Sequence, residues 1–262
     1  MFTERDMLNR IAEAERVFWF IDFDGTLVPI VRRPELVELE TGRRAALSLL
    51  ASREATRVTV ISGRPLADVR RLIDLPTVAC AGNHGLEIAG AGIRFRHPGG
   101  VAARDSLKGV KRGWIEAAGR YRGSLVEDKG MSITFHYRQV AAVLQEKARL
   151  AAREEAEKFA ASGKIRITAG KKVVEVRPPV AWGKGDALRH LLRHWRHRRE
   201  KDLVVALGDD ETDRDMFGPA REEGLAIFVG RGEPPTEATA RLPGPAAVAR
   251  FIEKAARQKA QV

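Results

Sequence analysis

The sequence predicts an α/β protein with a doubly wound, Rossmann-like parallel-sheet core that carries an inserted second domain. Short apolar runs typical of buried strands alternate with helical patterns along the first hundred residues, and this order returns after residue 180. Between the two parts the pattern changes to helix-strand-strand, twice over. We therefore expect a core made of residues 1–100 and 180–262 and an inserted α-β-β-α-β-β cap domain at 101–179.

The elements follow in order from the apolar periodicity and the turn residues. Core strands are expected at 17–21, 57–61, 77–81, 203–207 and 225–229. Core helices are expected at 4–16, at 36–52, after the turn at 62–65, from 185 onward and at 246–256. In the insertion, helices are expected at 102–121 and 140–161, and strands at 124–129, 131–138, 164–169 and 172–177. Right-handed crossovers then place helices on both faces of the core sheet.

Composition favours a soluble globular protein with a small anionic ligand. The net charge is +11, from 46 basic and 35 acidic residues, which suits long-range attraction of an anion. The single cysteine, Cys80, excludes an intrachain disulfide framework and lies in a predicted buried strand. No apolar run approaches the ~20 residues that span a bilayer. The start of the chain lacks a signal-peptide pattern, so we expect a cytoplasmic protein with no membrane partner.

The densest basic segment, 189–199, also invites a nucleic-acid hypothesis. Leu188, Leu191, Leu192 and Trp195 follow helical spacing, so we interpret the segment as an amphipathic helix whose charges form a solvated outer face. Aromatic residues make up only 6% of the chain, and no RNP, zinc-finger or K-homology pattern is present. We therefore expect no nucleic-acid partner.

Carboxylates follow two of the predicted core strands at the edge where open α/β sheets bind ligands. Asp22 and Asp24 come directly after the first strand, and Gly25 allows a sharp turn there. Asp209 follows the strand at 203–207, with Asp213 four residues later. Crowded carboxylates repel one another unless a cation neutralises them, and three oxygen ligands suit Mg²⁺. An ordinary acidic turn at Asp22, and a helix cap at Asp213, are the alternatives.

A phosphate group would need positive charge and donors beside such a carboxylate cluster. Ser62 ends the second strand, where a hydroxyl and the following backbone N–H groups can bind phosphate oxygens. Lys184 opens a helix between two glycines, so its ammonium can reach the site as a point charge. Taken singly, Ser62 is more typical of a helix cap and Lys184 of a surface lysine than of a phosphate site; their order along the chain favours the phosphate interpretation.

The ordered set D-x-D-G-T, Ser, Lys and G-D-D-x-x-D resembles the haloacid dehalogenase superfamily of Mg²⁺-dependent phosphatases. Further motifs narrow the resemblance to the trehalose-6-phosphate phosphatase family, which carries a type IIB cap. These motifs lie at 22–30, 62–64, 82–85, 127–130, 135–138, 171–178 and 208–217. The resemblance implies that Asp22 is the nucleophile, that Asp24 is the general acid and base, and that Ser62 and Lys184 hold the phosphate. It also implies that Asp22, the backbone oxygen of Asp24 and Asp209 bind Mg²⁺, with Asp213 acting from behind them.

The insertion carries the candidate specificity residues. Along 131–138 apolar and polar residues alternate, which predicts one face packed on the helices and one polar face. From the residues alone, that polar face is either a sugar-binding surface or an ordinary solvent-facing one. The resemblance favours sugar binding. It points first to Glu127, Lys129 and Glu175, and then to Arg64, His84, Arg138 and Arg177.

The resemblance implies a phosphorylated disaccharide substrate, with trehalose 6-phosphate first and a sucrose or mannosyl phosphate as alternatives. We expect a monomer working beside a trehalose-6-phosphate synthase; a non-catalytic phosphosugar sensor is the alternative outside the enzymes. One departure from the family pattern is visible: Arg214 stands where the family commonly has glutamate. We expect it on a helix surface, away from the metal ligands.

Overall fold

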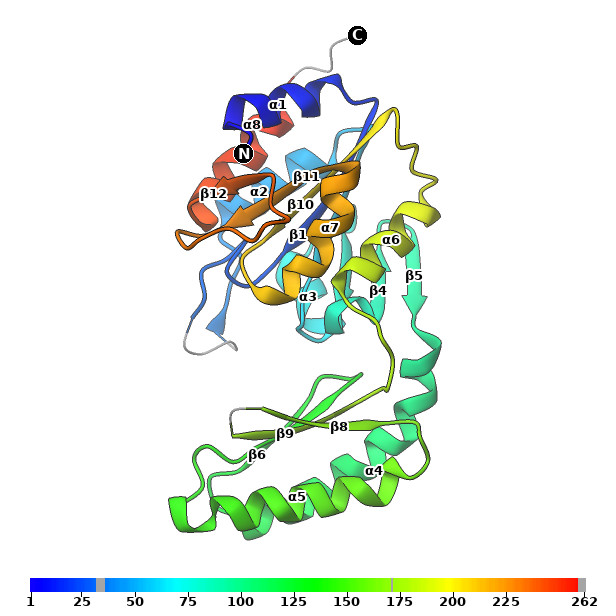
Figure 1. Cartoon of the computed structure of the whole chain (residues 1–262), viewed down its shortest axis with the longest axis vertical. Helices are drawn as coiled ribbons and strands as arrows, with labels where there is room; N and C mark the ends of the chain where they lie inside the picture. Colours follow the sequence, from blue (N-terminus) through cyan, green and yellow to red (C-terminus); the bar gives the residue numbers. More distant parts are fainter. Residues whose placement is uncertain (32–35, 171, 259–262) are drawn as a thin grey trace. The chain divides into compact units, whose positions relative to one another are not determined.

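The computed structural model describes residues 1–31, 36–170 and 172–258, and it divides the chain into two compact units (Figure 1). The core unit comprises Met1–Phe95 and Trp182–Val262, and the inserted unit comprises Arg96–Ala181. Each unit contains its own sheet with helices packed on it. The predicted fold class, a doubly wound α/β core with an inserted α/β domain, is confirmed.

The core sheet places the first strand of the chain at its centre. Strand β1 (Arg16–Asp22) pairs in parallel with β10 (Asp202–Gly208) on one side and β2 (Thr56–Ile61) on the other. Among the described residues the strand order is β12-β11-β10-β1-β2-β3-β4-β5. The remaining strands are β3 (Ala79–Gly82), β4 (Glu87–Gly90), β5 (Ile93–Arg96), β11 (Gly224–Val229) and β12 (Ala240–Leu242). The parallel pairing brings the ends of β1, β2 and β10 to one edge.

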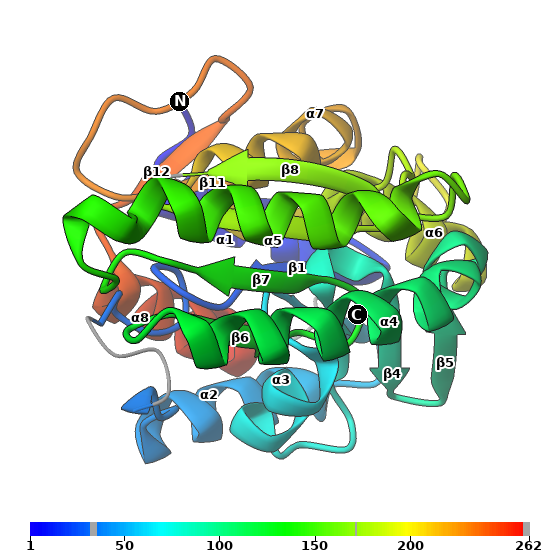
Figure 2. The ribbon, with the colours of Figure 1, turned by 90° about the horizontal axis from the view of Figure 1, so that it is seen from below.

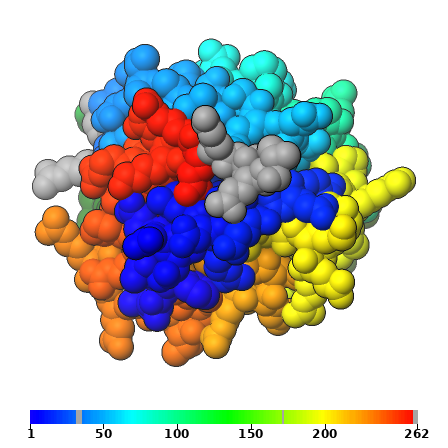
Figure 3. Space-filling model, turned by 90° about the horizontal axis from the view of Figure 1, so that it is seen from above, coloured from blue at the N-terminus to red at the C-terminus, as the bar shows by residue number. Residues whose placement is uncertain are grey.

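Helices cover both faces of this sheet because its central strands are apolar on both sides. In β1, Val17, Trp19 and Ile21 join one core cluster, whereas Phe18 and Phe20 join the other. The first face is covered by α1 (Glu4–Glu13), α2 (Thr41–Ala51), α3 (Leu66–Ile73) and α8 (Pro245–Arg257). The second is covered by α6 (Lys184–His194) and α7 (Arg214–Glu223). Figure 3 shows the outer surface of the helices on this first face, where α1, in dark blue, lies beside α8, in red.

The inserted unit is a smaller two-layer structure with an antiparallel sheet in the order β6-β7-β9-β8. Its strands are β6 (Leu125–Asp128), β7 (Ile133–His136), β8 (Arg166–Gly170) and β9 (Val173–Arg177). Helices α4 (Pro98–Arg120) and α5 (Gln145–Ala160) lie side by side on one face of it (Figure 2). Trp114 joins them, because its buried indole N–H donates to the Ala152 carbonyl at 2.7 Å.

Several helices begin at other residues than expected, and in α4 a capping group explains the shift. The helix expected at 102–121 begins at Pro98, since proline suits a first helical turn and the His97 ring accepts the Gly99 N–H at 3.1 Å. The helix expected from residue 36 begins at Thr41. The strands β4, β5 and β12, at or next to the edges of the core sheet, were not predicted. They are only three or four residues long, too short to show a clear alternation.

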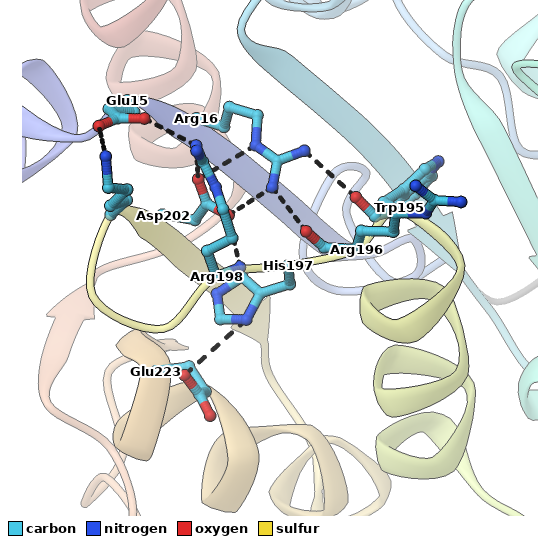
Figure 4. Close-up of polar contacts among 9 residues, drawn as sticks. Glu15, Arg16, Trp195, Arg196, His197, Arg198, Asp202 and Glu223 are labelled. Carbon is cyan, nitrogen blue, oxygen red and sulfur yellow. Dashed lines mark hydrogen bonds and ion pairs between the residues drawn. The ribbon is translucent and has the colours of Figure 1, made fainter.

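The interpretation of 189–199 as one solvated amphipathic helix is wrong in its second half. Helix α6 ends at His194, and the chain turns at Arg196, whose φ is +51°. Arg198 does not lie on a helical outer face; it donates to Asp202 at 3.1 Å and to Glu15 at 2.7 Å (Figure 4). In this loop Arg198 pairs with the buried Asp202 carboxylate, whereas Arg199 and Lys201 pair with Glu223 and Glu15, and helical periodicity does not reveal these pairings.

Asp202 is the centre of this cluster. Arg16, at the start of β1, donates to both of its carboxylate oxygens, at 2.6 and 3.1 Å. The same guanidinium donates to the backbone carbonyls of Trp195, at 3.2 Å, and Arg196, at 2.7 Å. Burial opposes ionisation of Asp202, but the bonds from Arg16 and Arg198 outweigh it and lower the pKa to about 2. The beginnings of β1 and β10 and the end of α6 are thereby tied together.

Asp202→Asn should therefore reduce stability in an acid-sensitive way. A carboxyl whose folded pKa lies below its unfolded value stabilises the protein above about pH 4, and this contribution is lost as the pH falls toward 2. We expect the wild type to be about 2 kcal/mol more stable than the variant at neutral pH, with about 1 kcal/mol of that gone by pH 3. Urea denaturation at pH 7, 5 and 3 measures this. Asp105→Asn, at an exposed carboxyl of α4, is the matched control; equal pH profiles for wild type and D202N would contradict the assignment.

Candidate active site

The loop after β1 brings the first two carboxylates to the sheet edge. Asp22 is the last residue of β1 and is buried, whereas Asp24 lies beyond the buried Phe23 and is partly exposed. Gly25 has a φ of +88°, and a Cβ there would lie 2.1–2.5 Å from the Asp209 carboxylate. Only glycine therefore lets this loop approach Asp209 so closely.

Lys184 joins two of the carboxylates inside the protein. Its Nζ lies 2.7 Å from an oxygen of Asp22 and 2.6 Å from Oδ1 of Asp213. The lysine is only 3% exposed, so it is a fixed buried cation and not a mobile surface residue. Oδ2 of Asp213 accepts the backbone N–H groups of Asp209 and Asp210 at 3.0 and 3.1 Å. Asp213 thus fixes both the lysine and the loop that carries Asp209.

The cluster contains more carboxylates than the lysine neutralises. Burial raises the pKa of Asp22 to about 7 although Lys184 acts in the opposite direction. Burial, with Asp22 nearby, raises the pKa of Asp213 to about 7, and burial, with Asp213 and Asp210, raises that of Asp209 to about 6. Burial opposes the Lys184 ammonium, but the two carboxylates outweigh it and raise its pKa. The site therefore favours a further positive charge.

A divalent metal ion fits this deficit. Asp22, Asp209 and Asp213 each present an oxygen within 4.8 Å of the others. The second oxygen of Asp22 is buried and has no hydrogen-bond partner among the described residues. Carboxylate oxygens are the hard ligands that Mg²⁺ prefers, and this second Asp22 oxygen is available to bind the ion. Asp210 is occupied differently, because its Oδ1 accepts the N–H and hydroxyl of Thr212 and caps a helical turn.

Two neighbouring contacts fix Asp24 and Asp209. The Arg64 guanidinium donates to both oxygens of Asp24, each at 2.6 Å, which is a bidentate pair. Arg64 was predicted from the sequence as a sugar contact, whereas in the structure its guanidinium pairs with Asp24, the predicted general acid. The Thr26 hydroxyl donates to Asp209 at 3.2 Å. Both contacts join segments that are distant in the chain, and no sequence pattern indicates either pairing.

The loop after β2 forms the adjoining wall. Ser62 is buried, and its Oγ accepts the backbone N–H of Arg64 at 3.1 Å. Asn83 and His84 have φ values of +52° and +56°, a strained pair of left-handed residues. Their backbone N–H groups donate to the carbonyls of Arg64 and Ser62, at 2.8 and 2.9 Å. The His84 ring packs on Gly63, where an added Cβ would lie 2.8 Å from the ring.

In the inserted unit the predicted polar residues share one sheet face. Strand pairing places Glu127 opposite Thr134, and Thr134 opposite Glu175. Glu127 also contacts His136 at 2.9 Å and Lys129 at 3.7 Å. His136 was not among the predicted site residues, although the strand alternation puts it on the Glu127 face.

The other predicted residues lie at the ends of these strands. Arg177 ends β9, and Arg138 lies two residues beyond β7, where it is exposed. Lys171, the first residue of one family motif, lies outside the described residues. On the opposite face Ile133, Phe135 and Tyr137 pack with α4 and α5, as the alternation predicted.

Comparison with known proteins identifies the family. The profile of the trehalose-phosphatase family matches residues 20–245. The chain belongs to the trehalose-phosphatase family. It is 37% identical over 244 residues to a protein of Mycobacterium tuberculosis named trehalose-phosphate phosphatase, covering 91% of this chain and 61% of that protein. It is also 36% identical, over 95% of its length, to 19% of a much longer M. tuberculosis protein named as an uncharacterized glycosyl hydrolase.

Solved structures agree with this assignment. An Aspergillus fumigatus trehalose-6-phosphate phosphatase is 25% identical, with a TM-score of 0.69 over 98% of both chains. The C-terminal domain of a Candida albicans trehalose-6-phosphate phosphatase, at 24% identity, has the same fold, with a TM-score of 0.73 over 97% of both chains. The chain spans 61% of the length of the mycobacterial proteins named trehalose-phosphate phosphatase that it matches. None of the described helices is long and apolar enough to cross a membrane.

Arg214, where the chain departs from the trehalose-phosphatase pattern, is adjacent in sequence to the predicted metal ligand Asp213, but its side chain pairs with other residues. Arg214 is the first residue of α7, and its guanidinium pairs with Glu211 at 2.9 Å and Glu237 at 3.4 Å. Its side chain is 40% exposed. Cys80 is buried in β3, and burial raises the pKa of its thiol to about 12, which disfavours the thiolate.

The raised carboxyl pKa values predict opposite pH effects with and without Mg²⁺. A carboxyl whose folded pKa exceeds its unfolded value stabilises the protein at low pH, and this contribution is lost as the pH rises from about 4 to about 7. A Mg²⁺ ion held by these carboxylates would require their ionised form, so the stabilisation that it gives should grow over the same range. We expect Mg²⁺ to raise Tm more at pH 8 than at pH 5, and Asp209→Asn to reduce that rise. A Tm shift independent of pH would contradict this account.

Proposed function

We propose that this chain is a Mg²⁺-dependent phosphatase that hydrolyses trehalose 6-phosphate to trehalose and phosphate. The observation that carries the proposal is the buried Asp22 carboxylate, which has one oxygen on Lys184 and the other without a partner among the described residues. A carboxylate in this state is available as a nucleophile. Membership of the trehalose-phosphatase family and the mycobacterial relatives' names support the choice of substrate.

In the first step the Asp22 carboxylate attacks phosphorus and an aspartyl-phosphate forms as the bond from phosphorus to the sugar oxygen breaks. Asp24 gives its proton to the departing sugar oxygen. In the second step Asp24 takes a proton from water, which attacks the same phosphorus, and phosphate and free Asp22 are released. Because Arg64 now occupies both Asp24 oxygens, we propose that this pair opens when the substrate enters.

The remaining residues hold the phosphoryl group. Lys184 offers a buried ammonium beside Asp22, and Ser62 offers a hydroxyl at the end of the neighbouring strand β2. Asp22 and Asp209, with the backbone oxygen of Asp24, would hold Mg²⁺, and Asp213 would orient the cluster from behind. Bound Mg²⁺ supplies electrostatic stabilisation of the negative charge on the phosphoryl oxygens.

We propose further that the inserted unit selects the sugar. Glu127, Lys129 and Glu175 share a polar sheet face in which carboxylates and a cation can bind sugar hydroxyls. Arg138, Arg177 and His84 are secondary candidates. A sucrose phosphate or a mannosyl phosphate is the alternative substrate within the same chemistry. A monomeric cytoplasmic enzyme working beside a trehalose-6-phosphate synthase is the cellular setting that we propose.

The decisive assay is phosphate release from trehalose 6-phosphate, with and without Mg²⁺, beside sucrose 6-phosphate, glucose 6-phosphate and p-nitrophenyl phosphate. We expect Mg²⁺-dependent preference for trehalose 6-phosphate. Activity on p-nitrophenyl phosphate alone would keep the core chemistry and discard the substrate. No activity on any of the four would favour a phosphosugar sensor.

Asp22→Asn should preserve the fold and lower turnover by at least about a thousandfold, since the amide is a poor nucleophile. Initial rates and circular dichroism measure the two effects. Asp68→Asn, at an exposed carboxyl of α3, is the matched control and should retain full activity. Turnover near the wild-type rate in D22N would remove Asp22 as the nucleophile.

Glu127→Ala and Glu175→Ala should separate sugar recognition from chemistry. We expect kcat/KM for trehalose 6-phosphate to fall about a hundredfold, because each variant leaves sugar hydroxyls without a partner. Turnover of p-nitrophenyl phosphate, which has no sugar, should stay within about twofold. Glu146→Ala, at an exposed site on α5, is the control. A parallel loss on both substrates would argue against a specificity role.

A further inference from the structure

The start of helix α6, where Lys184 lies, is held by a residue of another helix. The first N–H groups of a helix have no partner within it. At the start of α6, the Gly183 N–H donates to Asp186 of the same helix at 3.1 Å. The Gly185 N–H instead donates to Oδ2 of Asp215, in α7, at 2.9 Å. The backbone beside Lys184 is therefore fixed from outside its own helix.

The two helices approach so closely that only glycine fits on either side of Lys184. A Cβ at Gly185 would lie 2.0 Å from the backbone oxygen of Asp215, which cannot move without moving α7. A Cβ at Gly183 would lie 2.1 Å from Oδ2 of Asp215. The glycines at 183 and 185, which the sequence suggested as a source of flexibility, serve here as points of close contact.

We propose that Asp215 is a positioning residue for Lys184 and acts together with Asp213 as a clamp from the beginning of α7. This inference rests on the proposed function, in which Lys184 holds the phosphoryl group. Asp213 fixes the ammonium at 2.6 Å, and Asp215 fixes the backbone next to it at 2.9 Å. A lysine side chain has several rotatable bonds, so its charge is placed accurately only when both ends are held.

The contact needs an acceptor at position 215 and not specifically a charge. An asparagine oxygen can accept the Gly185 N–H, whereas alanine leaves that buried N–H without this acceptor. The neighbouring Arg214 belongs to the same turn but pairs with Glu211 and Glu237, so it should not influence Lys184. The chain therefore offers a conservative variant and an adjacent control.

The test compares Asp215→Ala, Asp215→Asn and Arg214→Gln. We expect kcat/KM for trehalose 6-phosphate to fall about tenfold in D215A, since small displacements of a phosphate-binding group are costly to the transition state. D215N and R214Q should stay within about twofold of wild type. Equal impairment of D215N and D215A, or of R214Q and D215A, would overturn the proposal.

Calorimetry gives a readout that does not depend on turnover. Binding of inorganic phosphate in the presence of Mg²⁺ should weaken about tenfold in D215A, while binding of Mg²⁺ alone stays within about twofold. Equal weakening of both would indicate a general disturbance of the site and overturn the clamp. A wild type that binds phosphate but does not hydrolyse trehalose 6-phosphate would refute the proposed function, and phosphate binding by the variants would still decide the role of Asp215.

Discussion

The contact of the Lys184 ammonium with Asp22 and Asp213 is the interaction on which the rest of this structure depends. Burying an ion is costly unless an opposite charge meets it at hydrogen-bond distance, so the three side chains must arrive together. They come from the end of β1, the start of α6 and the turn before α7, separated by 162 and 29 residues. The parallel sheet makes this meeting possible, because the ends of its central strands share one edge.

The opposite end of β1 repeats the arrangement with the charges reversed. Arg16 begins the strand, pairs with the buried Asp202 and donates to the carbonyls of Trp195 and Arg196 just after α6 (Figure 4). Helix α6 is thus tied to β1 at both ends, through its first residue at Asp22 and through the carbonyls beyond its last residue at Arg16. Two polar ties and an apolar face between them leave the helix little freedom to slide along the sheet, and the Lys184 ammonium is held in place accordingly.

The sequence predicted the fold class and the grouping of Asp22, Lys184 and Asp209, because buried strands are continuous apolar runs and their ends are marked by polar residues. It could not predict the contacts that decide how these groups behave. The Arg64–Asp24 pair spans 40 residues, and the Arg16–Asp202 pair spans 186. Neither has a local periodic signal, since both depend on which strand lies next to which. The burial of Lys184 was missed for the same reason: flanking glycines indicate flexibility in a sequence, but here they permit close packing.

The proposed mechanism requires one carboxyl group at the end of β1 to act as a nucleophile and the other to act as an acid. The two groups lie in different surroundings. Asp22 is buried beside one lysine, where a carboxylate lacks solvation and is stabilised by any further cation that approaches it. Asp24 is partly exposed, and Arg64 donates to both of its oxygens, so that both are already engaged in a bidentate pair. Asp24 can therefore act as an acid only after Arg64 has moved away from it. A substrate phosphate is a suitable competing partner, because a guanidinium group binds phosphate and carboxylate with similar geometry. Under the proposed mechanism, the substrate would therefore draw Arg64 away from Asp24 and so allow Asp24 to donate the proton that the departing sugar oxygen needs.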